Sequence, residues 1–177
     1  LGQVMADCHF RIRLSTDELK DKPDELELEA QELKREFSKM KQPVVVDLKK
    51  AHLGLVGEKS VIHEQLKLLV AQLTFFQSYH DLEIVTIYNN RFDADFQWMR
   101  WYPHLRIHAV NVVGTVNSER KRDQILGSLH QMIKNRKNKL EESKKESRFL
   151  PHLIFIIDEP KLIMDHSIIE YLDKEGD

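Results

Sequence analysis

Two short polar segments of the sequence have the residue types of a nucleotide-binding site. The first is the Gly-Glu-Lys-Ser segment Gly57–Ser60, which follows the apolar stretch Leu53–Val56 and precedes a helical apolar pattern. The second is Asp158-Glu159, which directly follows the apolar run Leu153–Ile157. A lysine and a hydroxyl at a strand-to-helix turn bind phosphate groups, and an aspartate at the end of a buried strand holds magnesium. The two segments occur in the order that a P-loop nucleoside triphosphatase uses.

Asp158 and Glu159 have the form of a Walker B motif. In such a motif the aspartate lies in the magnesium shell, and the adjacent glutamate orients the attacking water. Apolar strands that end in Asp-Glu also occur where the two acids only leave the sheet or cap the next turn. The sequence leaves both interpretations open.

The first segment lacks the glycines of a phosphate loop. A working loop has the pattern Gly, four residues, Gly, Lys and Ser or Thr, so that bare backbone N–H groups surround the phosphates. With Lys59 and Ser60 in the last two positions, the glycine positions hold Leu53 and Glu58. Glu58 would repel a phosphate by ~1–4 kcal/mol per unit charge at ~4 Å. We predict a degenerate, non-functional Walker A region, in which Gly57 permits a turn, Ser60 caps the helix and Lys59 is solvated.

The composition excludes several classes of protein. The chain has 177 residues, of which 41% are hydrophobic, and a chain of this size can bury roughly 70% of its unfolded surface. Its 27 basic and 29 acidic residues nearly cancel, which disfavours binding to nucleic acid through a global field. The single cysteine, Cys8, excludes an internal disulfide and a cysteine-based metal site. The longest apolar run is far shorter than the ~20 residues of a membrane span, so we expect a soluble piece of a larger protein.

The first part of the chain predicts a strand–helix–strand extension. Apolar and basic residues alternate over residues 10–14, as in a half-buried strand. Apolar residues at helical spacing predict a helix over residues 26–40, which Pro43 ends. Residues 44–46 are three valines, typical of a short strand. We take residues 1–42 as an N-terminal strand and helix that pack on the core.

Residues 43–177 predict an α/β domain. Strands are expected at 53–56, 82–88, 106–113 and 153–157, and helices at 62–76, 96–101 and 125–140. This alternation, with nearly continuous apolar strands, is typical of a parallel sheet joined by right-handed crossovers and covered on both faces.

Aromatic and histidine residues in the middle of the chain form a second group of candidates. Trp98, Trp101 and Tyr102 could bind a partner, with His104 beside them. Because the two tryptophans are three residues apart and share a helical face, core packing with one exposed edge is favoured. His104 and His108 have even strand spacing, but no cysteine or carboxylate completes a zinc site.

Residues 117–148 carry ten Lys or Arg and five Asp or Glu. This excess could contact DNA or an acidic membrane. A solvated helix with mixed charges is the favoured explanation of this excess. The acidic residues 17–36 could meet a basic partner, but the outer face of the helix at 26–40 is the favoured interpretation.

Five segments resemble the FtsK/SpoIIIE-type ATPases of type VII protein secretion, the EssC/YukB/EccC group, and in particular their first, degenerate ATPase-like domain. The segments are Gln42–Leu48, Leu53–Gly57, Phe76–Ile84, Trp98–His104 and Pro151–Glu159. The Trp-x-x-Trp-x-Pro-His segment is the most distinctive, because two tryptophans before Pro-His are improbable by composition.

The resemblance implies a P-loop/RecA-like three-layer sandwich with a mostly parallel sheet. It also implies a cytoplasmic module of a membrane-anchored bacterial motor that exports small helical WXG-type proteins. In this family ATP and magnesium bind in other, catalytic domains, so no cofactor is expected here. The expected partners are those domains, the membrane secretion complex and a small ubiquitin-like cytosolic component, without nucleic acid. An active ATPase domain with an atypical loop and a DNA-translocase domain are the alternatives.

Overall fold

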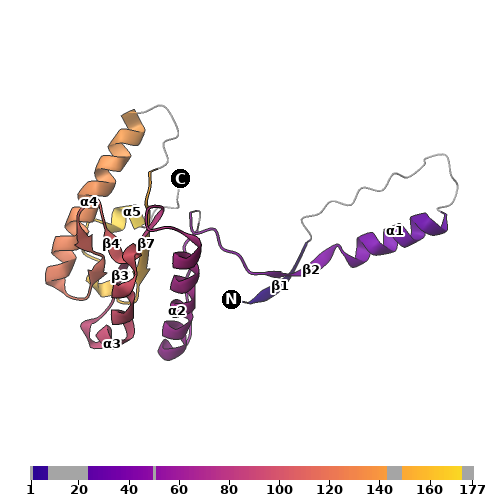
Figure 1. Cartoon of the computed structure of the whole chain (residues 1–177), viewed down its shortest axis with the longest axis horizontal. Helices are drawn as coiled ribbons and strands as arrows, with labels where there is room; N and C mark the ends of the chain where they lie inside the picture. Colours follow the sequence, from indigo (N-terminus) through magenta and orange to yellow (C-terminus); the bar gives the residue numbers. More distant parts are fainter. Residues whose placement is uncertain (1, 8–23, 50, 143–148, 173–177) are drawn as a thin grey trace. The chain divides into compact units, whose positions relative to one another are not determined.

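The structure is a computed structural model that describes residues 2–7, 24–49, 51–142 and 149–172 (Figure 1). Two compact units make up the chain, Leu1–Leu53 and Gly54–Asp177. The predicted strand at residues 10–14, Cys8 and the last part of the basic segment, residues 143–148, lie outside the described residues. In the parts of the chain that the structure describes, no helix is both long and apolar enough to cross a membrane.

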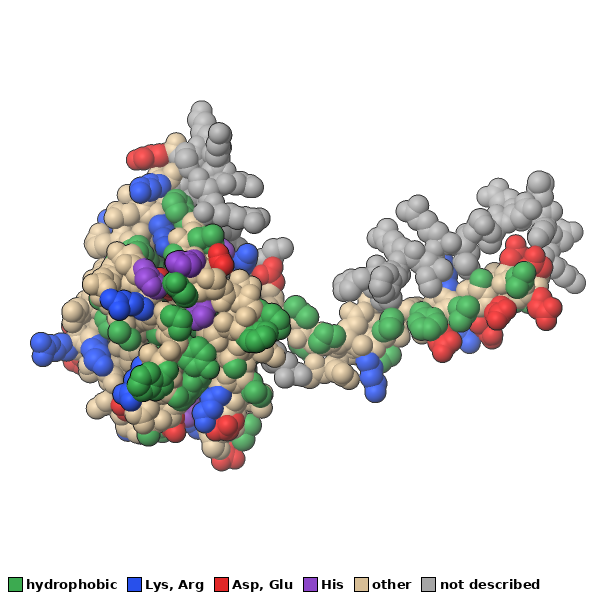
Figure 2. Space-filling model, in the orientation of Figure 1, with side chains coloured by type: hydrophobic (Ala, Val, Ile, Leu, Met, Phe, Trp, Pro, Cys, Tyr) green, Lys and Arg blue, Asp and Glu red, His purple; other side chains and the backbone are tan. Residues whose placement is uncertain are grey.

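The smaller unit contains one helix and a two-stranded antiparallel sheet. The helix α1 (Glu25–Glu36) begins with a capping box, in which Asp24 accepts a hydrogen bond from the Glu27 backbone and Glu27 accepts one from the Asp24 backbone. The strands are β1 (Gln3–Asp7) and β2 (Lys39–Pro43). No residue of α1 is buried, and Figure 2 shows hydrophobic and acidic side chains exposed together on this unit. Among the residues of this unit that the structure describes, none buries the apolar side of α1.

The elements near Pro43 differ from the prediction. The helix ends at Glu36 instead of residue 40, because the backbone from Lys39 onward pairs with β1. The predicted strand at residues 44–46 is wrong. The pairing stops with the hydrogen bond from Val44 N to Gly2 O (3.0 Å), at the residue just before β1 begins. Residues 53–56 are likewise not in a strand, since no described strand pairs with them.

The larger unit is built on a three-stranded parallel sheet with the order β6–β3–β7. Its strands are β3 (Leu82–Ile87), β6 (Thr115–Val116) and β7 (His152–Ile157), and its main helices are α2 (Lys59–Phe76), α4 (Glu119–Glu142) and α5 (Ile169–Leu172). The central strand β3 is buried along its whole length and pairs with β7 from Leu82↔His152 to Ile87↔Ile157. The strands predicted at 82–88 and 153–157, the helices predicted at 62–76 and 125–140, and the α/β class are confirmed.

Helices cover both faces of this sheet. Ile84 of β3 packs in a cluster with Val70 of α2 on one face. The next residue, Val85, packs with Leu126 and Leu129 of α4 on the other face. The alternation of side chains along β3 therefore supplies both apolar layers.

The region between β3 and α4 consists of short elements. They are the 3₁₀ helices η1 (Asn90–Phe92), η2 (Gln97–Trp101) and η3 (Pro103–Leu105), the helix α3 (Asp93–Phe96) and the hairpin strands β4 (Arg106–Ile107) and β5 (Val112–Val113). The prediction of one strand over 106–113 is wrong: β4 and β5 pair antiparallel around a turn in which Asn111 has a φ of 51°. Asparagine is one of the residues that adopt this left-handed conformation readily.

Gly114 lies where β6 meets the central strand. Its carbonyl accepts a hydrogen bond from Thr86 N, and its N–H donates to Leu105 O, both at 2.7 Å. A Cβ on this residue would lie 2.6 Å from Ile84 O. Only a residue without a side chain fits so close to the backbone of β3.

Candidate functional site

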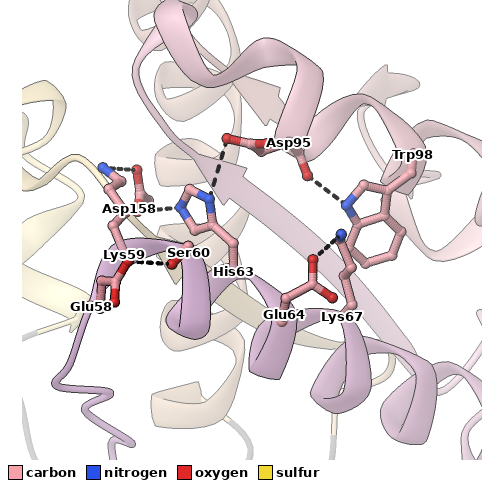
Figure 3. Close-up of polar contacts among 9 residues, drawn as sticks. All are labelled: Glu58, Lys59, Ser60, His63, Glu64, Lys67, Asp95, Trp98 and Asp158. Atoms are coloured by element: carbon pink, nitrogen blue, oxygen red, sulfur yellow. Dashed lines mark hydrogen bonds and ion pairs between the residues drawn. The ribbon is translucent and has the colours of Figure 1, made fainter.

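The structure brings the two candidate nucleotide-binding segments together. Lys59 is the first residue of α2, and Asp158 directly follows β7. The Lys59 Nζ lies 3.0 Å from Asp158 Oδ2 (Figure 3) and 3.7 Å from the centre of the Phe92 ring. The prediction that Lys59 is an ordinary solvated lysine is therefore wrong, because its charge is held between a carboxylate and an aromatic face.

The contact between Lys59 and Asp158 is ionic. Asp158 Oδ2 is buried and has no hydrogen-bond partner among the described residues, so the 3.0 Å approach brings opposite charges together without hydrogen-bond geometry. The side chain of Asp158 is 13% exposed and that of Lys59 is 42% exposed. One partner is thus largely shielded from water, and the other reaches it from the surface.

His63 is a third member of the site, which the sequence reasoning missed. It lies one turn after Lys59 on α2 and is buried. Its Nε2 lies 3.2 Å from Asp158 Oδ1, and its Nδ1 lies 3.4 Å from Asp95 Oδ2 (Figure 3). The ring also makes edge contacts with Phe92 and Phe96. The available signal was the spacing of four residues between Lys59 and His63, which places both on one face of the helix.

The imidazole of His63 therefore bridges two carboxylates. Each ring nitrogen points to an aspartate, and an imidazole that carries hydrogen on both nitrogens can donate to Asp95 and Asp158 together. With Lys59, the site contains two basic groups against two carboxylates. Because each carboxylate oxygen of Asp158 contacts one of these basic groups, the orientation of its side chain is fixed.

The start of α2 differs from a phosphate loop. Glu58 is the N-cap residue but makes no side-chain capping bond, and the Ser60 hydroxyl donates to Glu58 Oε1 at 2.8 Å. The prediction that Ser60 caps the helix is wrong, because Ser60 is already the second residue of α2. Gly57 does not adopt a positive φ. The carboxylate of Glu58 thus lies at the N-terminus of α2, where a phosphate loop would hold a phosphate. It also accepts the hydrogen bond of the Ser60 hydroxyl, which in a working loop would bind the cation that accompanies the phosphate.

Glu159 leads from the sheet into the next turn. Its N–H donates to Ile87 O at 3.2 Å, and its carbonyl accepts a hydrogen bond from Leu162 N, also at 3.2 Å. Leu162 is the last residue of η4 (Pro160–Leu162). The backbone contacts of Glu159 therefore fit the interpretation of an acid that leaves the sheet at a turn.

A tyrosine network holds α3 over the same end of the sheet. The Tyr88 hydroxyl donates to Asp93 Oδ1 at 2.8 Å, and Asn117 Nδ2 donates to the same oxygen at 3.1 Å. Burial, followed by the hydrogen bond to Asp93, raises the pKa of Tyr88 well above its ordinary value. Tyr88 also stacks on Phe96, so α3 and Asp95 are fixed relative to β3.

The two candidate tryptophans, Trp98 and Trp101, differ in their burial. Trp98 is half-buried in the cluster on the α2 side and donates its Nε1–H to Asp95 O at 2.6 Å. Trp101 is 77% exposed, with the Arg100 guanidinium 5.0 Å from its ring. The prediction that both tryptophans share a core face is wrong for Trp101. The buried residue of η2 is Met99.

The two histidines after Pro103 have different roles. His104 is buried, and its Nε2 lies 2.8 Å from the carbonyl oxygen of Gln77. Contrary to the prediction, it therefore does not lie on a surface that could bind a partner. His108 is exposed on one side, and its Nδ1 lies 2.9 Å from Oε1 of the fully buried Glu83. Among the described residues no three His, Cys, Asp or Glu side chains could hold a metal ion.

Comparisons with known proteins identify relatives along the whole chain. It is 34% identical over 175 residues to the ESX secretion system protein YukB of Bacillus subtilis, which covers 98% of the chain. It is 31% identical to the ESX secretion system protein EccC of Geobacillus thermodenitrificans, over 100% of the chain. It is 34% identical to the type VII secretion system protein EssC of Staphylococcus aureus strain MSSA476, over 99% of the chain.

The matched region is a small part of each relative. The chain spans 12% of the length of YukB, EccC and EssC. No protein-family model matches the chain, and no solved structure matches it. The resemblance seen in the sequence is nevertheless confirmed: the chain is homologous over its whole length to one region of the EssC, YukB and EccC proteins of type VII secretion systems.

Proposed function

We propose that the chain is a non-catalytic, ATPase-like module of a type VII secretion motor. In this proposal it has a P-loop/RecA-like fold of the FtsK/SpoIIIE type with a degenerate Walker A region. It transmits conformational change between the membrane complex and the catalytic ATPase domains during export of WXG-type proteins. The observation that supports it is the ion pair between Lys59 and Asp158.

The ion pair matters because both charges have other partners in a working site. A P-loop lysine contacts the β- and γ-phosphates, and a Walker B aspartate binds through the magnesium shell, so bound Mg-nucleotide separates them. Here the two side chains neutralise each other at 3.0 Å, and His63 holds the second oxygen of Asp158. Nucleotide would have to break this pair and also lie beside Glu58.

The relatives support the cellular setting of the proposal. They are named as components of ESX or type VII secretion systems, which implies a membrane-associated machine. We place the module on the cytoplasmic face of the cell membrane, where the proposed partners are the other domains of the same motor, the membrane complex and a small ubiquitin-like component. ATP and magnesium act in those other domains.

One observation favours an alternative, an active ATP-binding domain with an atypical loop. Lys59, Asp158 and Glu159 all lie at the carboxyl end of β7, the end of a parallel strand at which such sites form. A DNA-translocase domain has less support. On α4, Arg122 pairs with Asp123 at 2.7 Å, and Arg136 donates to Pro151 O, so part of the basic excess serves internal contacts.

A titration with Mg-ATP separates these functions. For the proposed module, labelled ATP with excess magnesium shows no saturable binding to the chain at micromolar concentrations. Micromolar binding that Asp158→Asn abolishes, and that the matched change Asp165→Asn at an exposed carboxylate leaves intact, would overturn the proposal. DNA binding that weakens steeply with salt, and that disappears when Lys134, Lys137 and Lys139 are neutralised, would instead support the translocase.

A further inference from the structure

A groove follows α4 beside the hairpin of β4 and β5 (Figure 1). It consists of two cavities, of about 410 Å³ and about 310 Å³, which are lined by successive turns of the same helix. The smaller cavity lies between β5 and residues 121–125 of α4. The larger cavity lies between the turn of the hairpin and residues 128–139. None of the lining residues belongs to the candidate site described above.

One wall of the groove is apolar. It contains Val110 and Val112 of the hairpin and Met132 of α4, which pack against the core cluster on the α4 side of the sheet. These three side chains are half-buried, and Val113 beside them is exposed. The wall therefore leaves apolar surface within reach of a ligand, and burial of this surface would favour binding.

The other wall is a stripe of amide and hydroxyl side chains on α4. Its members are three or four residues apart and therefore lie on one face of the helix: Gln124, Ser128, Gln131 and Asn135. No described residue makes a hydrogen bond to the side-chain amides of Gln124, Gln131 and Asn135. Each of these amides offers two N–H donors and an acceptor oxygen, which are the groups that can pair with a peptide backbone.

The two ends of the groove are basic. Lys121 lines the smaller cavity, and Arg136 and Lys139 line the far end of the larger one. Among the described residues that line the two cavities there is no aspartate or glutamate. The groove is therefore complementary to a ligand that carries negative charge at two separated points.

Arg136 has no charged partner in the described part of the chain. Its side chain is half-buried, its Nη1 donates to Pro151 O at 2.9 Å, and no described carboxylate lies within ion-pair distance of it. Burial lowers the pKa of this guanidinium, although the charge of Glu83 acts in the opposite direction. A charge taken out of water without a counterion is costly. Because a guanidinium has further N–H groups that can hold a carboxylate in a bidentate contact, Arg136 favours an anionic group of a ligand.

The length of the groove fits an extended chain. Lys121 and Lys139 are its outermost basic residues, and the rise of 1.5 Å per residue places them roughly 27 Å apart along α4. An extended peptide rises about 3.3 Å per residue, so roughly eight residues span this distance. A helical ligand would need more than twice as many residues to reach both ends.

We propose that the groove between α4 and the hairpin binds an extended acidic peptide of a partner protein. Carboxylates near one end of the peptide pair with Arg136 and Lys139, and a carboxylate near the other end pairs with Lys121. Apolar side chains between them cover the apolar wall, and the amides of α4 bond to the peptide backbone. Nucleic acid is a poorer fit, because its row of phosphates needs a longer row of cations and leaves the apolar wall uncovered. This inference does not depend on the proposed function, since the groove is separate from the candidate site.

Selection from a phage library of random peptides of about nine residues tests the chemistry of the ligand. The 177-residue chain is the target, and the variant Arg136→Gln is used in parallel. Peptides selected on the unmodified chain are expected to carry Asp or Glu near both ends and apolar residues between them. The same peptides should not be enriched on the variant. A selection that yields no peptides, or peptides without acidic residues, would overturn the proposal.

Fluorescence anisotropy with a selected peptide, labelled with fluorescein, locates the site of binding. Arg136→Gln is expected to weaken binding about 10-fold or more, and Lys139→Gln about three- to fivefold. Lys137→Gln is the matched control, because it removes the same charge from an exposed residue of α4 that lines neither cavity. Its affinity should stay within about twofold of the unmodified chain.

Two results of this titration contradict the proposal. The first is equal weakening by Lys137→Gln and Lys139→Gln, which would show a response to the net charge of α4 instead of to the groove. The second is displacement of the peptide by an equal concentration of a duplex oligonucleotide, which would show a surface for polyanions of any kind. If Arg136→Gln does not fold, the comparison of the two lysine variants still decides.

Discussion

The ammonium of Lys59 lies 3.0 Å from the carboxylate of Asp158, so the residues best suited to bind nucleotide phosphates and magnesium contact each other. The chain supplies both charges itself. Each of the two side chains thus lies beside an opposite charge at this end of the sheet.

A double-mutant cycle should detect the coupling between these two residues. We expect Lys59→Met and Asp158→Asn each to lower the free energy of unfolding. The double variant should lose less than the sum, by about 1 kcal/mol, because the pair is partly exposed. Chemical denaturation of the four proteins measures this coupling. Strict additivity would show that the ion pair contributes nothing to stability.

His63 should matter more to stability than Asp95, although the two are in contact. Replacing His63 with leucine leaves Asp158 Oδ1 without its partner in a largely buried position, which we expect to lower stability by about 1–3 kcal/mol. Asp95 is half-exposed, so its carboxylate is solvated when the partner is lost. Asp95→Asn is the matched variant, with an expected change below about 1 kcal/mol. Equal losses for the two variants would contradict this account.

Gly114 and Gly127 should respond to alanine in opposite ways. At Gly114 the new Cβ would lie 2.6 Å from Ile84 O and 3.3 Å from Leu105 O, both backbone atoms that cannot rotate away. We expect Gly114→Ala to lower the free energy of unfolding by about 1–3 kcal/mol. Gly127 lies within α4 with no atom within 4 Å of its would-be Cβ, so Gly127→Ala should stabilise by about 0.5–1 kcal/mol. Thermal unfolding of both variants checks the sign of each effect.

Acid should destabilise the larger unit through His166. Burial, and then the charge of Arg122, lower the pKa of His166, and its Nδ1 accepts a hydrogen bond from Ile168 N at 3.1 Å. Because the folded pKa is below the unfolded value of 6.5, the unfolded chain binds the proton first as pH falls. The free energy of unfolding should therefore decrease as pH falls below 6.5, and level off below the folded pKa.

The variant His166→Gln tests the source of this pH dependence. It removes the titrating group, so its stability should change less between pH 7 and pH 5 than that of the unmodified chain. His52→Gln, at an exposed histidine of the smaller unit, should keep the original profile. Denaturant titrations at several pH values give the comparison. An unchanged profile in His166→Gln would assign the effect to other groups.

The elements that local pattern determines were predictable from the sequence. The apolar runs of β3 and β7 and the long helix α4 are confirmed because burial on a sheet or one helix face leaves a strong periodic signal. The strands expected at residues 44–46 and 53–56 have the composition of strands, but a strand also needs a neighbour. Which strands pair depends on the whole fold, so the sequence of a single segment does not show whether it has a neighbour.

The candidate site was predictable in part for the same reason. Lys59 and Asp158 were identified by their types and positions, and the structure brings them together. His63 and Asp95 complete the site through a contact between α2 and α3. These two helices are separated along the chain, so no local sequence pattern shows that the residues meet. Trp101 was assigned to the core because it lies three residues after Trp98, but the buried residue of η2 is Met99. The spacing of residues along one short helix does not show which of its sides the rest of the fold covers.

The register of the central strand has a consequence for how the protein is made. Leu82 of β3 pairs with His152 of β7, which is synthesised long after it, while the shorter β6 pairs at the other edge near Thr86. During translation β3 is therefore exposed along one side until β7 has left the ribosome. Non-local parallel pairing of this kind forms slowly, and the waiting apolar strand is open to wrong partners. The yield of folded protein should thus depend on how quickly the last third of the chain arrives.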